Sequence, residues 1–174
     1  MTYTDLDLEL IPSGTDVTTA TFPAAYYPTA YVDLGVSPDI GTGADLVCLL
    51  TVETYTAGSN TYLTAQIISS SATNLTSNQN ILGDSGAISA ADLEAMDDAG
   101  RVGYQPIVIR INPNHWDALS TSTTGVSSDV GRYLSVRLNH AGANPTTMTV
   151  HATFVTNWTS NPALSWHASG SAIA

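Results

Sequence analysis

Histidine and cysteine are the residues of this chain most suited to binding metals or acting as nucleophiles. The four histidines lie far apart, at His115, His140, His151 and His167, without the His-x-x-x-His or Cys-His spacing of a zinc site. The single cysteine, Cys48, lies inside an apolar run, whereas reactive thiols occupy electropositive, partly exposed positions. We therefore expect no zinc site, no disulfide framework, and a buried, inert thiol at Cys48.

A second candidate for chemistry is the segment Gly83-Asp84-Ser85-Gly86, which resembles the segment around the nucleophile of chymotrypsin-like serine proteases. In that family the general-base histidine precedes the serine, whereas every histidine here follows Ser85. The Gly-Pro pair that usually extends the motif is also missing. The sequence favours a plain turn over a protease site, and we expect that the protein is not an enzyme.

Acidic side chains gather near a predicted helix, at Asp92, Glu94, Asp97 and Asp98. Their spacing differs from that of the Asp-x-Asp-x-Asp-Gly calcium loop, so a solvated helix face is the favoured interpretation. The pair Gly41-x-Gly43 has no phosphate-binding context and is interpreted as an ordinary loop. The sequence therefore predicts no cofactor.

Several aromatic side chains could stack on sugars if they are exposed. They are Tyr26, Tyr27, Trp116 and Trp158. Packing within the fold is the favoured interpretation for these residues. A carbohydrate-binding β-sandwich module stays open as an alternative function.

The composition limits the possible partners. The chain has 174 residues, 43% of them hydrophobic, and a mean hydropathy of +0.07, which suits one folded domain with its own core. It has no lysine, four arginines and a net charge of −11, so it cannot neutralise a run of nucleic-acid phosphates or an anionic membrane surface. No stretch approaches the ~20 apolar residues of a membrane span, and the N-terminus has no signal-peptide pattern. We expect a protein that folds in a cytoplasm and binds neither nucleic acid nor membrane.

The strongest structural signal lies between Tyr31 and Ser69. Two long apolar runs, from Asp45 to Tyr55 and from Thr61 to Ser69, are separated by the turn-forming segment Ala57-Gly58-Ser59-Asn60. This arrangement predicts a β-hairpin. The first run is apolar on both faces at its start, which predicts a central strand covered on both sides for half of its length.

Further runs predict strands before and after this hairpin. They are Thr15 to Phe22, Thr29 to Leu34, Tyr104 to Asn112, Arg132 to Asn139 and Thr146 to Thr156. In the last two strands the side chains expected to face inward are Leu134, Val136, Leu138, Met148, Val150, Ala152 and Phe154.

The polar stretches at 70–88 and 114–131 indicate long loops. Between them, Ser89-Ala90-Ala91-Asp92 resembles a capping box that begins a short helix, with Leu93 and Met96 on one face and Gly100 placed to end it.

Together these elements predict an all-β fold, an antiparallel β-sandwich or jelly roll with one short helix in a long loop. We expect the domain to span 15–156, with an N-terminal arm or edge strand at 1–14 and a C-terminal tail at 157–174. In the first segment Asp5, Asp7 and Glu9 alternate with leucines. An edge strand with one wet face is favoured, and an arm that reaches a neighbouring molecule is the alternative.

Five segments carry a resemblance to a known family. They are Tyr31-Val32-Asp33-Leu34-Gly35, Asp45-Leu46-Val47-Cys48-Leu49-Leu50-Thr51-Val52, Tyr62-Leu63-Thr64-Ala65-Gln66-Ile67, Val108-Ile109-Arg110-Ile111-Asn112-Pro113 and Gly131-Arg132-Tyr133-Leu134-Ser135-Val136-Arg137-Leu138. In this order they resemble the small capsid cement (decoration) proteins of tailed phages. In that family a strand ending in Asp-Leu-Gly, two long sheet strands, a strand ending near Pro and an Arg-Tyr-Leu strand follow one another. The similarity covers residues 15 to 156.

The resemblance implies a jelly-roll protomer that assembles as a homotrimer on the outer capsid surface of the virion and clamps neighbouring major capsid proteins, without catalysis. It places assembly in the host cytoplasm. The chain departs from the family in its long segments at 70–103 and 113–131 and in the tail after Asn157. We expect the partner contacts to come from the acidic arm, the outward row of the strand at 132–139 and the tryptophan-bearing segments. The candidate contact residues are Asp5, Asp7, Glu9, Trp116, Tyr133, Ser135, Arg137, Trp158 and Trp166.

Overall fold

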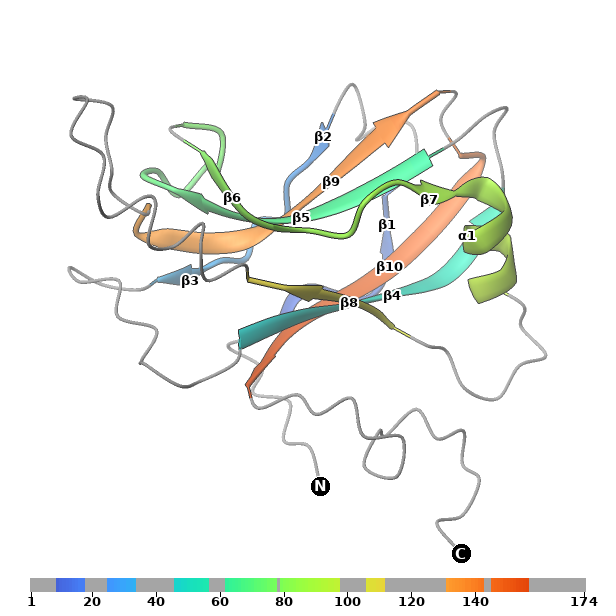
Figure 1. The fold of residues 1–174 in the computed structure, drawn as a ribbon, viewed down its shortest axis with the longest axis horizontal. Helices are drawn as coiled ribbons and strands as arrows, with labels where there is room; N and C mark the ends of the chain where they lie inside the picture. The colour runs from blue at the N-terminus through green and yellow to red at the C-terminus, as the bar shows by residue number, and fades with distance from the viewer. Residues whose placement is uncertain are drawn as a thin grey trace, which may run out of the picture.

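The computed structural model describes residues 9–17, 25–33, 46–56, 62–77, 79–97, 106–111, 131–142 and 145–156. Within these residues the chain forms ten strands and one short helix, and the strands make two antiparallel sheets that pack face to face (Figure 1). The prediction of an all-β sandwich with one short helix is confirmed.

Sheet A contains four strands in the order β1-β10-β4-β8. Their bounds are Glu9–Asp16 for β1, Thr147–Thr156 for β10, Leu46–Thr56 for β4 and Ile107–Arg110 for β8. Every neighbouring pair is antiparallel, and β4 pairs with β10 along its whole length. These two long strands form the centre of the sheet.

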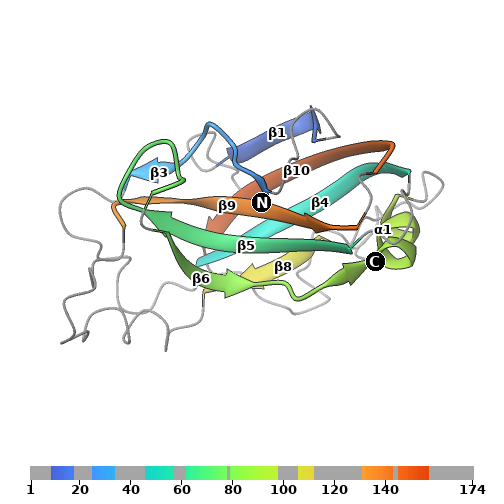
Figure 2. The same cartoon turned by 90° about the horizontal axis from the view of Figure 1, so that it is seen from above.

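Sheet B contains β2, β9, β5 and β6 in that order, with β3 also paired to β9 and β7 to β5. Their bounds are Ala25–Tyr26 for β2, Val32–Asp33 for β3, Tyr62–Ser70 for β5, Asn80–Asp84 for β6, Ile88–Ser89 for β7 and Tyr133–Ala141 for β9. All of these pairs are antiparallel. Figure 2 shows β9, β5 and β6 running side by side.

The predicted hairpin between the two long apolar runs is wrong. β4 belongs to sheet A and β5 to sheet B, so the turn signal at 57–60 lies between strands of opposite sheets. The physical reason is that each strand buries an apolar row. Cys48, Leu50 and Val52 of β4 and the inward side chains of β5 belong to the same core cluster, which the two sheets enclose.

One apolar core fills the space between the sheets. The predicted inward rows are confirmed, because all seven side chains are at most 1% exposed: Leu134, Val136, Leu138, Met148, Val150, Ala152 and Phe154. Burying each large apolar side chain contributes about 1.5–3 kcal/mol, so these rows specify which face of each strand turns inward.

A second apolar cluster lies on the other face of β4. Val47, Leu49 and Val155 are 0%, 4% and 9% exposed, and Val155 lies opposite Val47 in the strand register. Further along the same strand, the side chain of Glu53 is polar and only partly buried. β4 is thus a central strand buried on both faces over its first half, as predicted.

β1 spans residues 14 and 15, where the predicted N-terminal segment ends and the predicted domain begins. It runs through Pro12, Ser13 and Gly14 because its register against β10 shifts twice, first between Glu9 and Ile11 and again before Thr15. Such bulges let an edge strand absorb a proline and a glycine without ending. The described part of the predicted arm is therefore an edge strand, while residues 1–8 and 18–24 lie outside the described part.

Two predicted strands are shorter in the structure. Of the strand expected from Thr29 to Leu34, the described residues 29–33 form only β3, Val32–Asp33, and β2 at Ala25–Tyr26 was not predicted. The strand expected from Tyr104 to Asn112 contracts to Ile107–Arg110 within the described residues. Short edge strands of this kind carry too few residues for a clear alternation pattern.

The predicted surface loop at 70–88 is also wrong, because it contains β6. This strand pairs with the second half of β5, and Leu82 belongs to the core. Leu75, which precedes β6, is fully buried as well. The stretch is mostly polar because β6 contributes only one apolar side chain, Leu82, to the core, so its composition resembles that of a loop.

The predicted helix is confirmed as α1, Ala90–Met96, and it closes one end of the sandwich (Figure 1). The Ser89 hydroxyl caps it by accepting a hydrogen bond from the backbone N–H of Asp92 at 3.2 Å. Leu93 is buried in the core and Met96 packs against it. The helix ends at Met96, where the backbone N–H of the C-cap residue Asp97 donates the last helical hydrogen bond to the Leu93 carbonyl. The predicted end at Gly100 lies outside the described residues.

The two sheets approach each other closely along β6 and β8. A Cβ atom at Gly83 would lie 2.3 Å from the carbonyl oxygen of Arg110 and 3.1 Å from its carbon. Only glycine fits at this position without moving the backbone of β8. Gly83 therefore lets the edges of sheets A and B meet.

Candidate binding face

β9 presents a row of side chains on the outer face of sheet B. Since successive side chains of a strand point to opposite faces, the buried leucines and valine of β9 turn the alternate residues outward. Gln66 of β5 lies opposite Arg137, and Asp84 of β6 lies opposite Gln66. We call the outward side chains Asp84, Gln66, Tyr133, Arg137 and Asn139 the candidate binding face.

Two neutral amides hold the guanidinium group of Arg137. Its Nε donates to Gln66 Oε1 at 3.0 Å, its Nη1 donates to Gln79 Oε1 at 2.7 Å, and its Nη2 also donates to Gln66 Oε1. Among the described residues no carboxylate forms an ion pair with Arg137. A partly buried positive charge is thus oriented by protein oxygens without being neutralised by them.

Both amides are held in turn by further hydrogen bonds. Gln66 is 8% exposed; its Oε1 accepts from Asn139 Nδ2 at 2.7 Å and its Nε2 donates to Asp84 Oδ2 at 2.6 Å. The Nε2 of Gln79 donates to the backbone carbonyl of Leu75. The network therefore joins β6, β5 and β9 and fixes the orientation of each amide.

Ser135 points to the outer face as predicted, but it is not open to a partner. Its side chain is fully buried, and its Oγ donates a hydrogen bond of 2.8 Å to the carbonyl oxygen of Ala30. The segment before β3 lies over this part of β9. This burial corrects the prediction that Ser135 belongs to a contact row, and leaves Tyr133 and Arg137 as its accessible members.

Tyr133 belongs to a compact cluster at one end of β9. Arg132 and Asp33 form a two-pronged ion pair, with Nε–Oδ1 at 2.6 Å and Nη2–Oδ2 at 2.7 Å. The rings of Tyr31 and Tyr133 meet edge to face at 5.0 Å, and the Arg132 guanidinium carbon lies 5.5 Å from the Tyr133 ring centre. The hydrogen bond and the negative charge of Asp33 raise the pKa of Arg132 above its ordinary value.

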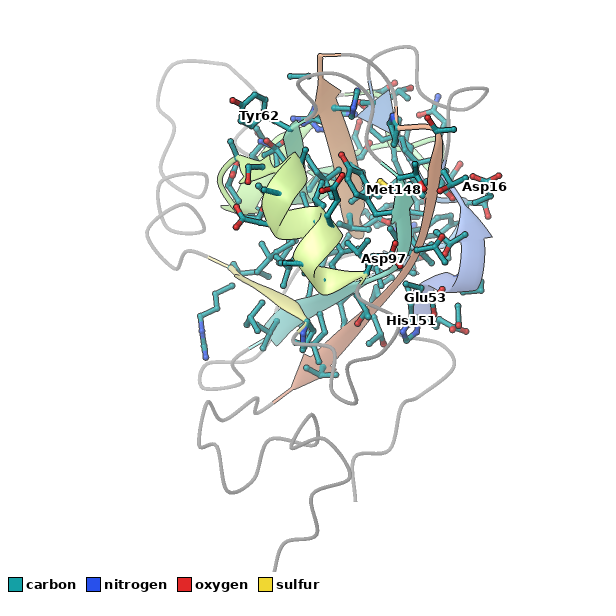
Figure 3. The ribbon with its side chains drawn as sticks, turned by 90° about the vertical axis from the view of Figure 1, so that its right-hand side faces the viewer. Asp16, Glu53, Tyr62, Asp97, Met148 and His151 are labelled. Atoms are coloured by element: carbon teal, nitrogen blue, oxygen red, sulfur yellow. The ribbon has the colours of Figure 1, made fainter. Side chains whose placement is uncertain are left out.

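The candidate residue Glu9 lies in sheet A, away from this cluster. Its Oε1 lies 3.3 Å from Nε2 of His151 on β10. Nearby, the carboxylate of Glu53 accepts hydrogen bonds from Ser13 Oγ and Gly14 N, both at 2.5 Å, and so ties β1 to β4. Figure 3 shows Glu53 and His151 close together beside β1. Both carboxylates stabilise the sheet edge in this structure.

The other five candidate contact residues lie outside the described residues, and their roles stay predictions: Asp5, Asp7, Trp116, Trp158 and Trp166. Two of the tyrosines considered for sugar stacking are partly buried in the fold. Burial raises the pKa of Tyr26, and the Tyr27 hydroxyl donates a long hydrogen bond of 3.5 Å to Gln79 Oε1.

Ser85 has a structural role in the segment that resembles a protease motif. Its Oγ accepts a hydrogen bond from the backbone N–H of Ala65 at 2.9 Å and donates to the Gly86 carbonyl at 2.8 Å. Gly86 adopts a φ of +71°, and its N–H donates to Asp84 Oδ1 at 2.6 Å. These contacts are those of a turn that extends the pairing of β5 and β6, which is the interpretation the sequence favoured.

Cys48 is fully buried, and this burial raises the pKa of its thiol to about 12.

The described residues bring no group of three or more His, Cys, Asp and Glu side chains together that could hold a metal ion. No helix among them has the length and apolar character needed to cross a membrane.

In sequence comparisons, no protein-family model matches the chain and no curated protein matches it.

The alternation along β9 predicts that Arg137 points outward, but it does not reveal the residues that position its side chain. Gln66 and Gln79 belong to a predicted strand and a predicted loop, and nothing in their spacing links them to Arg137. Gln66 reaches Arg137 through the register between β5 and β9, and Gln79 reaches it from the segment before β6, so both contacts depend on tertiary structure. The ion pair of Asp33 and Arg132 could not be predicted either, because it depends on the pairing of β3 with β9. Both residues lie in segments that carry the family resemblance.

Proposed function

We propose that this protein is a structural virion protein, which binds the outer surface of a tailed-phage capsid as a homotrimer and stabilises contacts between major capsid proteins. The proposal assigns it no catalytic activity and no cofactor. Its site of action would be the outer capsid surface, after assembly in the host cytoplasm. Support comes from the fold, from the segments that carry the family resemblance and from the character of the sheet edges.

We infer further that the sandwich is a jelly roll. The pairing supports this, because β1 pairs with β10, β3 with β9, β4 with β8 and β5 with β6, so early strands pair with late ones in nested order. A ribbon of four such antiparallel pairs, wrapped around a core, gives two four-stranded sheets. Jelly rolls recur in viral capsid proteins and in lectins, so the topology is compatible with the proposed role but does not select it.

The observation that carries the proposal is the meeting of two segments that resemble decoration proteins. The Tyr-Val-Asp segment at 31–33 and the Gly-Arg-Tyr segment at 131–133 are about a hundred residues apart, yet Asp33 bonds to Arg132 with both oxygens and Tyr31 packs on Tyr133. The pairing of β3 with β9 brings the two segments together, and the ion pair and the ring contact then join their side chains. We interpret the pair of segments as one structural unit.

The sheet edges favour contacts through faces. β1 carries Pro12 and two register shifts, features that prevent a further strand from pairing along an edge. On the other side, β6 and β8 approach each other at Gly83. A partner would therefore meet side chains of a sheet face, and binding several capsid subunits at once would add avidity to interfaces of about 1,200–2,000 Å² each.

Attachment to particles tests the proposal. Purified protein should co-sediment with capsids of the phage whose genome encodes it, at a fixed number of copies per capsid, and should raise the temperature at which those capsids release DNA. Tyr133→Ser should weaken attachment, whereas Val108→Ser, which changes a 38% exposed side chain of sheet A, should not. Absence of the wild-type protein from the particle fraction would contradict the proposal.

A carbohydrate-binding module of a phage fibre or surface protein is the second candidate. Arginine, amide and tyrosine side chains on one sheet face are suited to hydrogen bonds with sugar hydroxyls, and this observation favours it. A glycan array separates the two functions. Binding to a defined saccharide, reduced by Asn139→Ala, would support the module, while the capsid role predicts no saccharide binding.

A further inference from the structure

We propose that Arg137 is the receiving group of an interface between copies of this chain, at which its guanidinium binds a carboxylate of a second copy. This inference rests on the self-association contained in the proposed function. It adds to that proposal the residue that receives the neighbouring copy and the chemical class of the group that it binds.

The hydrogen bonds of Arg137 leave a free donor on each terminal nitrogen. A guanidinium group has five N–H bonds, one on Nε and two on each Nη. In Arg137, Nε and Nη2 each donate one hydrogen bond to Gln66, and Nη1 donates one to Gln79. Among the described residues one N–H is left on Nη1 and one on Nη2, and each can donate to a carboxylate oxygen.

The group is also held in place before any partner arrives. Gln66 and Gln79 orient the guanidinium, and both amides are fixed by Asn139, Asp84 and the Leu75 carbonyl. An arginine that is already ordered loses less side-chain entropy when it binds a partner than an unrestrained one. This pre-organisation distinguishes Arg137 from an ordinary surface arginine.

Charge indicates what the partner must offer. Arg132 is paired with both carboxylate oxygens of Asp33, whereas Arg137 has no carboxylate partner among the described residues. The chain has 15 acidic residues against four arginines, and each copy carries a net charge of −11. Close contact between copies would otherwise bring acid against acid, so an interface that includes an arginine opposite a carboxylate is favoured.

Sedimentation velocity over a concentration series, on the full-length chain, tests the inference with three variants. Arg137→Gln should weaken self-association by roughly thirty-fold or more, the effect of removing one member of an interfacial charge pair. Gln79→Glu should also weaken it, because it places a carboxylate of the same chain where Gln79 Oε1 now lies, 2.7 Å from Nη1. The control, Arg110→Gln, removes the same single charge from an exposed arginine of sheet A, and should change association by less than about two-fold.

Thermal unfolding of each variant checks the fold, and Gln79→Glu alone decides the question if Arg137→Gln unfolds. A wild-type protein that is monomeric at every concentration would overturn the inference, as would unchanged association in a folded Gln79→Glu variant. If the folded Arg137→Gln variant associates as the wild type does but no longer attaches to capsids, the inference is also wrong, and the carboxylate that Arg137 binds belongs to the capsid protein. Particle attachment of the wild-type chain tests the proposed function separately.

Discussion

Replacing Gly83 with alanine tests the close approach of the two sheets. The added Cβ would lie 2.3 Å from the carbonyl oxygen of Arg110, about 1 Å closer than the 3.4 Å at which ordinary contact begins. The obstructing atom belongs to the backbone of β8, which cannot turn away as a flexible side chain could. Overpacking typically costs about 1–3 kcal/mol, and we expect Gly83→Ala to lower the free energy of unfolding by about 3 kcal/mol.

For a chain of 174 residues, a loss of that size corresponds to a decrease in Tm of roughly 6–12 °C. Urea unfolding followed by circular dichroism and thermal melting measure the two quantities. Gly86→Ala is the matched control, because Gly86 has open space around its Cα and only its φ of +71° opposes a side chain. That strain should cost about 1–2 kcal/mol. A Gly83→Ala variant as stable as the wild type, or more stable than Gly86→Ala, would refute the packing of β6 against β8.

Three further predictions concern single side chains. Ser85→Ala should lower the free energy of unfolding by about 1–3 kcal/mol in urea, because it leaves the buried N–H of Ala65 without its 2.9 Å acceptor; an unchanged midpoint would contradict this role. Cys48 should not react with a thiol reagent such as DTNB at pH 8 until the protein unfolds, since its pKa is raised to about 12, and rapid labelling of the native protein would show that the strand is open. Burial lowers the pKa of His140 below 6.5, so folding favours its neutral form, and the resulting stability is complete above pH 6.5 and is lost as the pH falls through the lowered folded-state pKa. His140→Gln should therefore lose less stability than the wild type between pH 7.5 and about 5.5 in urea titrations, and an identical loss would exclude His140 as a cause.

The identity of the long strands and their inward faces could be predicted from the sequence, but their partners could not. The rows of β9 and β10 alternate strictly, so Leu138 and Phe154 could be assigned to the core from spacing alone. β4 and β5 are adjacent in the chain and separated by a turn signal, yet they lie in opposite sheets. Strand pairing depends on which arrangement buries both apolar rows at once, and a local pattern does not contain that information.

In the candidate binding face, too, the direction of a side chain could be predicted from the sequence, but its partners could not. The outward direction of Arg137 follows from alternation, while its orientation depends on Gln66 and Gln79, which reach it through the register of β5 and through the segment before β6. Ser135 shows the opposite error. Its position in the alternation is right, but the segment at 29–31 covers it, and only the folded chain reveals that contact.

A cryo-electron microscopy map of the virion is the sharpest test of the proposed capsid role. We expect density on the outer capsid surface into which the two-sheet sandwich fits, in groups of three, with the face of sheet B that bears Arg137 turned toward a neighbouring copy. A map in which the chain is absent from the capsid shell, or in which its density lies in a tail fibre, would show that the protein is not a capsid decoration protein.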